Sequence, residues 1–366
     1  MRGLRIATIG GDGVGPEVIE ATLPVLRAAA EASGVSVETV ALDWGGEHML
    51  RTGRAMPADG ADVLSECDGV LFGAVGRPDI PDDELIWGLI IGLRQALDLA
   101  VNVRPVRSWD GVTTAVRTEE PIDFVVVREN TEGEYAGVGG RVGQLGIEVA
   151  VHSRTAIERT ARYAFDLARQ RRGRVSLVTK SNAMRYGYPL WDEVTASVHL
   201  DYPDVELEHV LVDAMAARMV QRPGGLDVLL CSNLFGDILS DLAAGLVGGM
   251  GMAPSANVLP GRGPGLFEPV HGSAPDIAGA GIANPVACLL SAALLLDHTG
   301  VEGAGDRIRS AVTTTLRDPA THTPDLGGTA TTTDLSTSVL TNLQQPAGGA
   351  PSAPTEHLVS LPTSRR

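Results

Sequence analysis

The sequence predicts an α/β protein in which helices cover the faces of a parallel or mixed sheet. Short apolar runs typical of strands alternate with longer runs of helical periodicity, which is the pattern of βαβ units. At 366 residues, the chain also exceeds the usual size of one hydrophobic core. We therefore expect two lobes with a cleft between them.

The first part of the chain has the clearest alternation. Strands are expected at 4–10, 35–42 and 68–75, and helices near 15–33 and 57–66. Because a helix stands between each pair of consecutive strands, these segments are expected to form βαβ units.

The middle of the chain adds strands and a hairpin, and its end adds a tail. Five more apolar runs are expected to be strands: 123–128, 148–152, 174–179, 205–212 and 226–231. Around Gly137 to Gly146, glycines with Val and Ile on either side fit no helix and predict a projecting hairpin that could serve as a dimer arm. From about Gln345 the chain has too few apolar residues to pack, so a disordered tail is expected at 345–366.

The composition excludes several classes of protein. The formal net charge is -16, and no run of Lys or Arg could follow a phosphate backbone, so nucleic acid is not expected as a partner. The N-terminal segment begins as a strand rather than as a signal peptide, and no apolar run reaches the length of a membrane span. The scattered cysteines Cys67, Cys231 and Cys288 are typical of buried thiols. We expect a cytoplasmic protein with no membrane partner.

Two aspartates at the start of a helix indicate a metal site. Asp237 and Asp241 follow an apolar strand and, four residues apart, project from one face of the helix. Two like charges at this spacing destabilise a helix unless a cation lies between them, and carboxylate oxygens suit Mg²⁺ or Mn²⁺. Apolar neighbours disfavour a purely solvated acidic face. Asp213, at the end of another strand, could complete the site.

Three arginines could hold a diacid. Arg94 lies in a Gly-Leu-Arg-Gln segment, and Arg104 and Arg128 each follow a short apolar strand. Guanidinium groups bind carboxylates through paired hydrogen bonds. Each residue alone is more often part of a surface ion pair, so this prediction depends on their meeting in one cleft.

Two further residues could transfer protons. Lys180 is the only lysine among the 29 basic residues. Because arginine stays protonated and cannot act as a base, Lys180 marks either a position where an amine is required or a lysine that remained by chance. Tyr135 lies in a polar turn, where its phenol could deliver a proton or simply pack.

Two glycine-containing segments could approach a ligand closely. The segment from His271 to Asp276, closed by Asn284, has the Gly, Ser and Asn content of a ligand-binding loop. The motif GDGVGPE after the first strand resembles a dinucleotide-binding turn but lacks the spacing of GxGxxG. As a Rossmann fingerprint it is weak.

Seven motifs together resemble the isocitrate, isopropylmalate and tartrate/D-malate family of β-decarboxylating dehydrogenases. They are GDGVGPE, LRQALDLAVNVRP, RENTEGEYAG, TKSN, VDAMAARM, NLFGDILSD and FEPVHGSAPDIAGAGIANP. The resemblance spans nearly the whole chain. It implies that Lys180 is a required amine and not a chance survivor.

The resemblance implies an isopropylmalate-dehydrogenase-like two-domain fold with a shared mixed sheet, distinct from the classical Rossmann fold. Residues 1–96 and 253–344 would form the cofactor-side domain. Residues 97–252 would form the substrate and dimerisation domain, with a hairpin arm near 136–153. The resemblance also implies a homodimer whose active site is shared between the subunits.

The resemblance assigns roles to the candidate residues. The substrate-binding residues would be Arg94, Arg104, Arg128 and Asn182. The ligands of Mg²⁺ or Mn²⁺ would be Asp237 and Asp241 of one subunit and Asp213 of the other. Lys180 and Asn182 would come from the partner chain, with Lys180 as the base and Tyr135 as the acid that protonates C3.

The implied cofactor is NAD. Its binding residues would be Glu268, His271, Gly272, Ser273, Ala274, Asp276, Ile277 and Asn284. A carboxylate at Asp276 accepts hydrogen bonds from ribose hydroxyls and repels a 2′-phosphate, so NAD⁺ is favoured over NADP⁺. His271 is expected near the adenine, and Glu268 near the nicotinamide ribose or Lys180.

The implied substrate is a (2R)-2-hydroxy diacid of malate type, which is oxidised and decarboxylated to a 2-keto acid and CO₂. The segment 85–94 should contact the substituent on C3. It lacks the Ser and Asn pair of isocitrate-specific members, and its Trp87-Gly-Leu resembles the tartrate/D-malate branch. Ile90 and Ile91 could instead bind an isopropyl group, which leaves 3-isopropylmalate dehydrogenase as an alternative. A non-catalytic diacid-binding or regulatory subunit is the alternative from another class.

Overall fold

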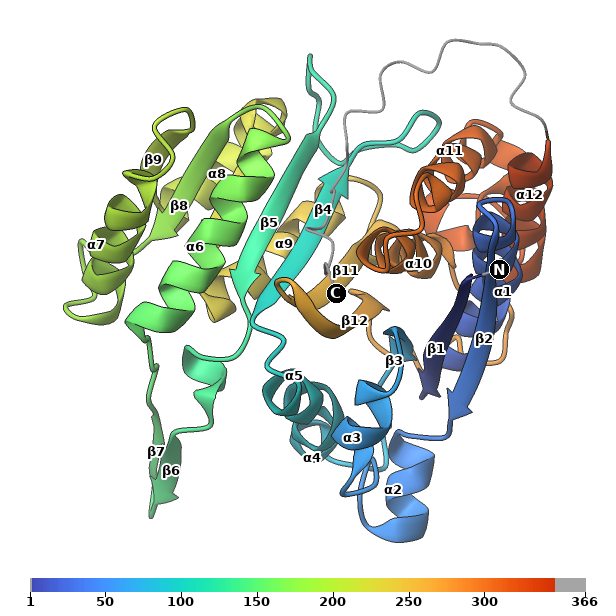
Figure 1. Ribbon diagram of the computed structural model, residues 1–366, viewed down its shortest axis with the longest axis horizontal. Helices are drawn as coiled ribbons and strands as arrows, with labels where there is room; N and C mark the ends of the chain where they lie inside the picture. The colour runs from blue at the N-terminus through green and yellow to red at the C-terminus, as the bar shows by residue number, and fades with distance from the viewer. Residues whose placement is uncertain (1, 346–366) are drawn as a thin grey trace.

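A ten-stranded sheet runs across the computed structural model, which describes residues 2–345 (Figure 1). Its strands, in the order in which they lie side by side, are β2 (Val35–Leu42), β1 (Arg2–Gly11), β3 (Gly69–Ala74), β12 (Arg262–Pro269), β11 (Pro254–Leu259), β4 (Val101–Arg107), β5 (Asp123–Glu129), β10 (Val228–Cys231), β8 (Arg174–Thr179) and β9 (Glu206–Leu211).

The strands fall into two parallel groups that run in opposite directions. β2, β1, β3 and β12 are parallel to one another, and so are β5, β10, β8 and β9. β11 and β4 lie between the groups and pair antiparallel with both of their neighbours. Segments far apart in the sequence therefore meet at the centre of the sheet.

Helices cover both faces of the sheet. Beside β1 to β3, four helices pack together: α1 (Gly15–Glu31), α10 (Val286–His298), α11 (Ala304–Leu316) and α12 (Thr332–Gln344). On the other half, the helices in front of the sheet in Figure 1 are α6 (Arg154–Arg169) and α7 (Gly187–His199), and those behind it are α8 (Val212–Gln221) and α9 (Asn233–Leu246).

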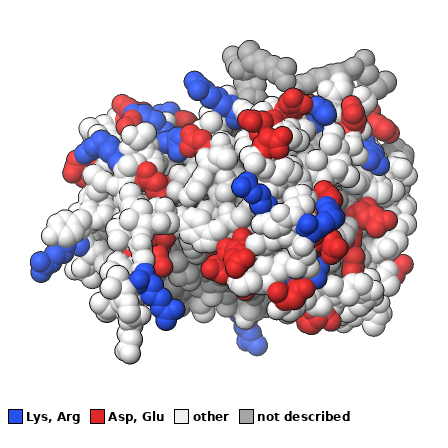
Figure 2. Space-filling model, turned by 90° about the horizontal axis from the view of Figure 1, so that it is seen from below, with Lys and Arg blue, Asp and Glu red and all other residues white. Residues whose placement is uncertain are grey.

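Short helices form the lower edge of the molecule in the view of Figure 1. They are α2 (Gly46–Thr52), α3 (Gly60–Ser65), α4 (Asp82–Leu85) and α5 (Gly92–Ala96), and a π-helical turn, Ile86–Ile91, joins the last two. Seen from below, this part of the surface carries many acidic side chains (Figure 2). Asp82, Asp83 and Glu84 lie in the first turn of α4, where their charges meet the positive end of the helix dipole.

The core follows the distribution of apolar residues. α10 is buried on nearly all sides because it lies between the sheet, α1 and α11. α6 is amphipathic and begins at Ser153, whose hydroxyl accepts a hydrogen bond from the backbone N–H of Ala156. The strands at the sheet centre are almost continuously apolar, which makes their few polar residues conspicuous.

The hairpin expected around Gly137 to Gly146 is present. Its strands β6 (Gly139–Val142) and β7 (Leu145–Glu148) pair antiparallel, and every residue in them is exposed. It projects from the molecule beside β5 and α6 (Figure 1). The predicted strand at 148–152 is wrong, because β7 ends at Glu148 and only an isolated bridge joins Val151 to Gly133.

Most other expected elements are confirmed, with two differences. The helix near 57–66 is confined to α3, Gly60–Ser65. β11 and β12 were not expected, since glycines and prolines interrupt their apolar patterns. The predicted tail lies, apart from Gln345, outside the described residues.

The α/β fold with a mixed sheet is confirmed. The division into residues 1–96 with 253–344 and residues 97–252 falls between β11 and β4, but separate domains remain a prediction. Within residues 2–345, no helix is both long enough and apolar enough to cross a membrane.

Candidate active site

A stripe of polar side chains crosses the centre of the sheet. Residues two apart on a strand point to the same face. The strand register sets Glu268 of β12 opposite Ser255 of β11, and it sets Asn257 of β11 opposite Asn102 of β4. Asn102 in turn lies opposite Arg128 of β5. One face of four adjacent strands therefore carries polar groups that the surrounding core lacks.

Hydrogen bonds join this stripe into a network. The side-chain amide of Asn102 donates to Ser255 Oγ at 2.8 Å and to Asn257 Oδ1 at 3.0 Å. Asn257 Nδ2 donates to Glu268 Oε1 at 2.8 Å, and Asn130 Nδ2 donates to Asn257 Oδ1 at 3.0 Å. All five side chains are buried, and buried polar groups are stable only with such partners. The network fixes the groups that face the site.

Three arginines reach the site from different elements. Arg94 comes from α5, Arg104 from β4 and Arg128 from β5. Their side chains are 12%, 8% and 2% exposed, so all three charges are largely removed from water. Arg94 Nη2 lies 3.0 Å from Glu268 Oε1, and Arg104 Nε donates to Asn102 Oδ1 at 2.8 Å. The structure brings the three predicted guanidinium groups into one cavity.

Asp237 is the carboxylate on which two of these arginines converge. Its Oδ1 lies 2.5 Å from Arg128 Nη1 and 3.4 Å from Arg104 Nη2. Arg128 also donates from Nε and Nη2 to Asn233 Oδ1, at 2.9 and 2.7 Å. Burial, with repulsion from Arg104, lowers the pKa of Arg128 to about 9, so this guanidinium still carries its charge at neutral pH.

Asp237 and Asp241 are both on α9 but differ electrostatically. Burial acts to raise the pKa of Asp237, but attraction to Arg128 and Arg104 outweighs it, and the pKa lies below its ordinary value. Burial raises the pKa of Asp241 above its ordinary value, although Arg104 Nη1 lies 3.2 Å from its Oδ1. Arg104 contacts both carboxylates and therefore supplies part of the positive charge that the helical spacing alone assigned to a metal ion.

Tyr135 lies on a 3₁₀ turn, Glu134–Ala136, and lines the cavity together with the arginines. Its hydroxyl donates to Asp237 Oδ2 at 3.1 Å, and the Arg128 guanidinium lies 5.6 Å from the centre of its ring. Burial and the nearby charge of Asp237 raise the pKa of Tyr135, so the phenol keeps its proton at neutral pH. A protonated phenol aimed into the cavity can act as an acid.

The cavity between these elements has a volume of about 290 Å³. Arginine, Asp237 and Tyr135 side chains line its polar part. Its apolar wall includes Ile86, Ile90 and Ile91 of the π-helical turn. The cavity can therefore hold a small anionic molecule that has one apolar or weakly polar side.

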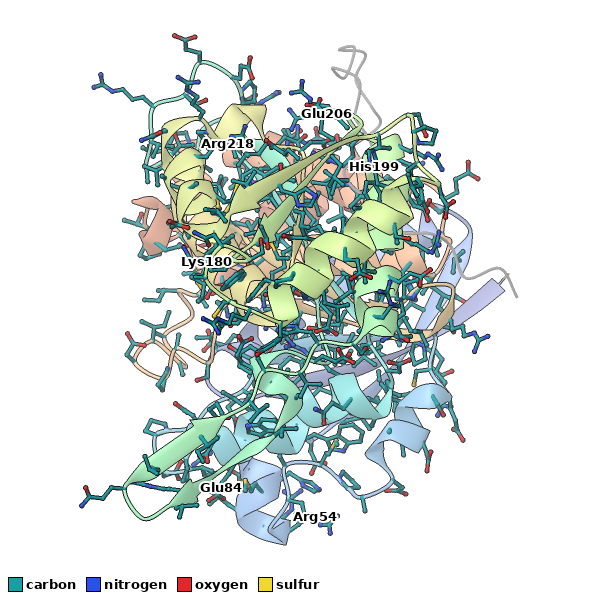
Figure 3. All side chains as sticks on the ribbon, turned by 90° about the vertical axis from the view of Figure 1, so that its left-hand side faces the viewer. Arg54, Glu84, Lys180, His199, Glu206 and Arg218 are labelled. Atoms are coloured by element: carbon teal, nitrogen blue, oxygen red, sulfur yellow. The ribbon has the colours of Figure 1, made fainter. Side chains whose placement is uncertain are left out.

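Lys180, Asn182 and Asp213 lie outside the cavity described above. Lys180 follows β8 and Asp213 is the second residue of α8, and Lys180 Nζ lies 2.7 Å from Asp213 Oδ1. The hydrogen bond from Lys180 lowers the pKa of Asp213. Asn182 is exposed. Figure 3 shows Lys180 on the same side of the molecule as Arg218 of α8. None of the three lines the cavity of their own chain.

The predicted cofactor segment follows β12 as a loop. His271 and Gly272 line the cavity, and burial lowers the pKa of His271. Ala274 has a backbone φ of 39°, a left-handed conformation that is strained for a residue with a Cβ atom. Asp276 is exposed, and Ile277 packs partly against the core.

Three members of the predicted cofactor set have protein partners. Glu268 Oε1 accepts from Arg94 and Asn257, and Glu268 lines the cavity. Asn284 Nδ2 donates to Asp325 Oδ2 at 3.0 Å. Ser273 accepts, through its backbone carbonyl, a hydrogen bond from the N–H of Val14 at 2.8 Å. These contacts support the loop itself.

The GDGVGPE motif supports the same loop. A Cβ atom on Gly13 would lie 1.9 Å from the carbonyl oxygen of Ser273, and one on Gly11 would lie 1.9 Å from that of Ala74. The buried carboxylate of Asp12 accepts from the N–H groups of Gly46 and Gly76. The glycines of this motif are therefore needed for close packing of backbone segments.

The residues present fit the implied metal ion and cofactor in part. The carboxylates of Asp237 and Asp241 supply the hard oxygen ligands that Mg²⁺ and Mn²⁺ prefer, and Mg²⁺ is commonly held by only one or two carboxylates. Within residues 2–345 of one chain, no group of three His, Cys, Asp or Glu residues could hold a metal ion. The exposed Asp276 and the His271 loop leave polar groups available to a dinucleotide.

Comparison with known proteins identifies the family. The family model described as isocitrate/isopropylmalate dehydrogenase matches residues 5–343. The chain belongs to the isocitrate/isopropylmalate dehydrogenase family. It is accordingly an oxidative decarboxylating dehydrogenase, and the resemblance expected from the seven motifs is confirmed.

Relatives of this dehydrogenase bear several substrate names. It is 47% identical over 349 residues to a "probable tartrate dehydrogenase/decarboxylase" of Agrobacterium vitis, covering 93% of this chain and 97% of that protein. It is 42% identical to a D-malate dehydrogenase [decarboxylating] of Escherichia coli K12, covering 93% and 98%. A 3-isopropylmalate dehydrogenase of Corynebacterium kroppenstedtii is 43% identical, covering 88% and 97%.

A crystal structure of isocitrate dehydrogenase from Methylococcus capsulatus has the same fold. The TM-score is 0.86 and the sequence identity is 38%, over 94% of this chain and the whole of that chain. The isopropylmalate-dehydrogenase-like architecture with a mixed sheet is therefore confirmed for this dehydrogenase.

Sequence reasoning missed several residues that build the site. They are Asn102, Asn130, Asn233, Ser240, Ser255 and Asn257. A usable signal was present for Asn102, which alternates with Arg104 between buried valines, so both side chains face the same way. The segment that contains Ser255 and Asn257 was not recognised as a strand, which concealed the same signal there.

Proposed function

We propose that this dehydrogenase oxidises a (2R)-2-hydroxy diacid of malate type with NAD⁺ and a divalent cation, Mg²⁺ or Mn²⁺, and releases a 2-keto acid and CO₂. The observation that carries the proposal is the convergence of Arg94, Arg104 and Arg128 in one cavity with Asp237 and Tyr135. Guanidinium groups recognise carboxylates, and two carboxylates on a small substrate match such a cluster.

Substrate binding would replace contacts that the arginines now make within the protein. Arg94 faces Glu268, and Arg104 and Arg128 face Asp237. A dianionic substrate adds negative charge next to three buried guanidinium groups, which favours its entry into the cavity. A cation held by Asp237 and Asp241 would then compensate the carboxylates of the enzyme.

The chemistry divides between two proton-transferring residues. When bound at Asp237 and Asp241, the cation would supply a Lewis acid that lowers the pKa of the 2-hydroxyl, and NAD⁺ would supply the acceptor for the hydride on C2. Lys180 of a second copy of the chain takes the hydroxyl proton. After the C3 carboxylate leaves as CO₂, the electron pair remains on C3, and the phenol of Tyr135 delivers a proton there.

A homodimer with a shared site follows from the same proposal. Lys180 and Asp213 are adjacent in one chain, with Nζ and Oδ1 2.7 Å apart, but they do not line the cavity of that chain. A symmetric partner could present both residues at once, which would complete a three-aspartate cation site and add the base. Asn182, two residues after Lys180, would then reach the substrate.

The cofactor preference rests on the loop after β12. Asp276 is exposed there, so its carboxylate is available to ribose hydroxyls and would repel a 2′-phosphate. This favours NAD⁺ over NADP⁺. His271, Gly272, Ser273, Ala274, Ile277 and Asn284 would form the rest of the binding loop.

The two candidate substrates differ in the substituent that they carry on C3. The tartrate and D-malate names of relatives at 47% and 42% identity favour an unsubstituted or hydroxylated C3. The wall formed by Ile86, Ile90 and Ile91 favours an apolar substituent, and this observation supports 3-isopropylmalate as the second candidate. We propose D-malate or tartrate, because the relatives with these names match 93% of this chain, whereas the 3-isopropylmalate dehydrogenase matches 88%.

A substrate panel tests this proposal. The enzyme is incubated with NAD⁺ and Mn²⁺ and with D-malate, tartrate, 3-isopropylmalate or isocitrate, and the absorbance of NADH is followed. Turnover is expected with D-malate or tartrate, and a higher kcat/KM with 3-isopropylmalate would favour the second candidate. Binding of the diacids without turnover of any of them would support a diacid-binding subunit and contradict the proposed function.

A further inference from the structure

The indole of Trp87 packs on the turn that carries Tyr135. Trp87 lies in the π-helical turn that also supplies the apolar wall of the cavity. A Cβ atom built on Gly137 would lie 2.9 Å from Cη2 and 3.1 Å from Cζ3 of this indole. The ring therefore covers the backbone of Gly137 so closely that no larger residue fits without displacing it.

Gly137 is needed at this point for a second reason. It directly follows the 3₁₀ turn Glu134–Ala136, and its φ of 70° is in the left-handed region that glycine adopts most easily. Tyr135 is two residues away. The contact with Trp87 thus acts on the end of the short turn that aims the phenol at Asp237.

The position of Trp87 itself depends on an irregularity in the helix. The N–H of Gly92 donates to the carbonyl of Trp87, five residues earlier, which defines the π-helical turn. Such a turn changes which side chains share a face of the helix. Ile90 and Arg94 face the cavity, whereas Trp87 is not among the residues that line it.

The exposure of Trp87 argues against an ordinary core role. Its exposed fraction is 40%, whereas those of Trp44, Trp109 and Trp191 are 4%, 7% and 1%. A tryptophan that served only to fill the core would be buried like the other three. Trp87 instead joins two segments that are distant in sequence and that both reach the cavity.

We propose that Trp87 is a positioning residue for Tyr135. By resting on Gly137, it ties the Tyr135 turn to the helix that carries Ile90 and Arg94, so that substrate held by Arg94 and the proton donor keep a fixed relation. This inference rests on the proposed function of Tyr135 as the acid. It predicts an effect on kcat, since Trp87 does not touch the cavity, and little effect on KM for the diacid.

Substitutions at two glycines test the contact between Trp87 and Gly137. Gly137→Ala places a Cβ against the indole, and Gly34→Ala is the matched control, because Gly34 has a φ of 76° but no atom within 4 Å of an added Cβ. Both variants carry the same kind of backbone strain. Gly137→Ala is expected to lower kcat roughly tenfold to a hundredfold, as misplacement of a reacting group does, and Gly34→Ala to leave it unchanged. Equal kcat values in the two variants would overturn the proposal.

A double-variant cycle tests whether Trp87 acts through Tyr135. Trp87→Ala is expected to lower kcat in the wild-type background and to cause no further loss in a Tyr135→Phe background, where the phenol is already absent. Leu50→Ala, at another exposed apolar residue, is the control for loss of surface area. Losses from Trp87→Ala and Tyr135→Phe that simply multiply would contradict a role for Trp87 through the phenol.

Hydrogen exchange supplies a readout that needs no turnover. Trp87→Ala is expected to speed exchange in peptides that span 133–138, and Leu50→Ala is expected not to. Unchanged exchange in these peptides would overturn the proposal. If the wild-type enzyme oxidises no diacid of the panel, the proposed function fails, and the exchange experiment still decides whether Trp87 holds this turn.

Discussion

The substitution Asp237→Asn should destabilise the folded protein, whereas Asp241→Asn should not. Arg104 and Arg128 are 8% and 2% exposed, and both contact the carboxylate of Asp237. Removing its charge leaves two buried guanidinium groups close together. Breaking a buried ion pair typically costs about 3–5 kcal/mol. Because Asp237 is 34% exposed and the amide of Asn still accepts hydrogen bonds, we expect about 2 kcal/mol.

The opposite pKa shifts of the two carboxyls give the control. The folded-state pKa of Asp237 is lowered, so its charge stabilises the fold above its unfolded-state pKa, and this contribution is lost as pH falls through the folded-state pKa. The folded-state pKa of Asp241 is raised by burial, so its charge opposes folding as pH rises through that range. Neutralising Asp241 therefore removes an unfavourable charge.

Urea unfolding without diacid, and with EDTA to remove divalent cations, measures both effects at one protein concentration. Asp237→Asn is expected to lower the unfolding midpoint at neutral pH, and the difference from wild type should shrink in acid, where Asp237 is protonated in both states. Asp241→Asn is expected to match or exceed the wild-type midpoint. Equal losses in the two variants, or none in Asp237→Asn, would refute the electrostatic description of this cluster.

Three further predictions concern catalysis and cofactor choice. Lys180→Met should leave NAD⁺ binding intact, measured by calorimetry, and lower kcat at least about a hundredfold, so near-normal turnover would remove Lys180 from the reaction. Tyr135→Phe should slow product formation by about a hundredfold or more with a nearly unchanged KM, and a rise in KM alone would assign the phenol to binding. Asp276→Lys should shift the ratio of kcat/KM values toward NADP⁺, and an unchanged ratio would exclude Asp276 as the discriminating residue.

The sequence predicted the site best where a simple periodicity carried the information. Asp237 and Asp241 are four residues apart on α9, as helical spacing requires, and Arg104 and Arg128 lie on strands of the sheet centre. What could not be predicted is their pairing. The contact of Arg104 with both aspartates depends on how β4 packs against α9, and local sequence contains no information on that packing.

The buried amide network was missed for a related reason. Asn102 and Asn257 each stand as one polar residue within an apolar run, and their significance appears only when β4 and β11 are paired in register. β11 and β12 also contain proline and glycine at positions that weaken a strand pattern. The contact between Glu268 and Arg94 could not be predicted either, because the two residues are 174 positions apart in the chain.

Lys180 illustrates a limit of a different kind. The scarcity of lysine drew attention to it, and the structure of one chain pairs it with Asp213 at a distance from the cavity. Neither residue lines the cavity of its own chain. A site shared by two chains would bring Lys180 of one chain to the cavity of the other, as the sequence predicts. The structure of a single chain does not contain this assembly.

Subunit complementation tests this central claim most directly. Lys180→Met and Tyr135→Phe are each expected to be nearly inactive, and they are mixed in equal amounts under conditions that exchange subunits. In a mixed dimer, the cavity with an intact Tyr135 would receive the intact Lys180 of the other chain. Random pairing should therefore restore about a quarter of wild-type turnover. No recovery, with exchange verified by native mass spectrometry, would contradict a site shared between two subunits.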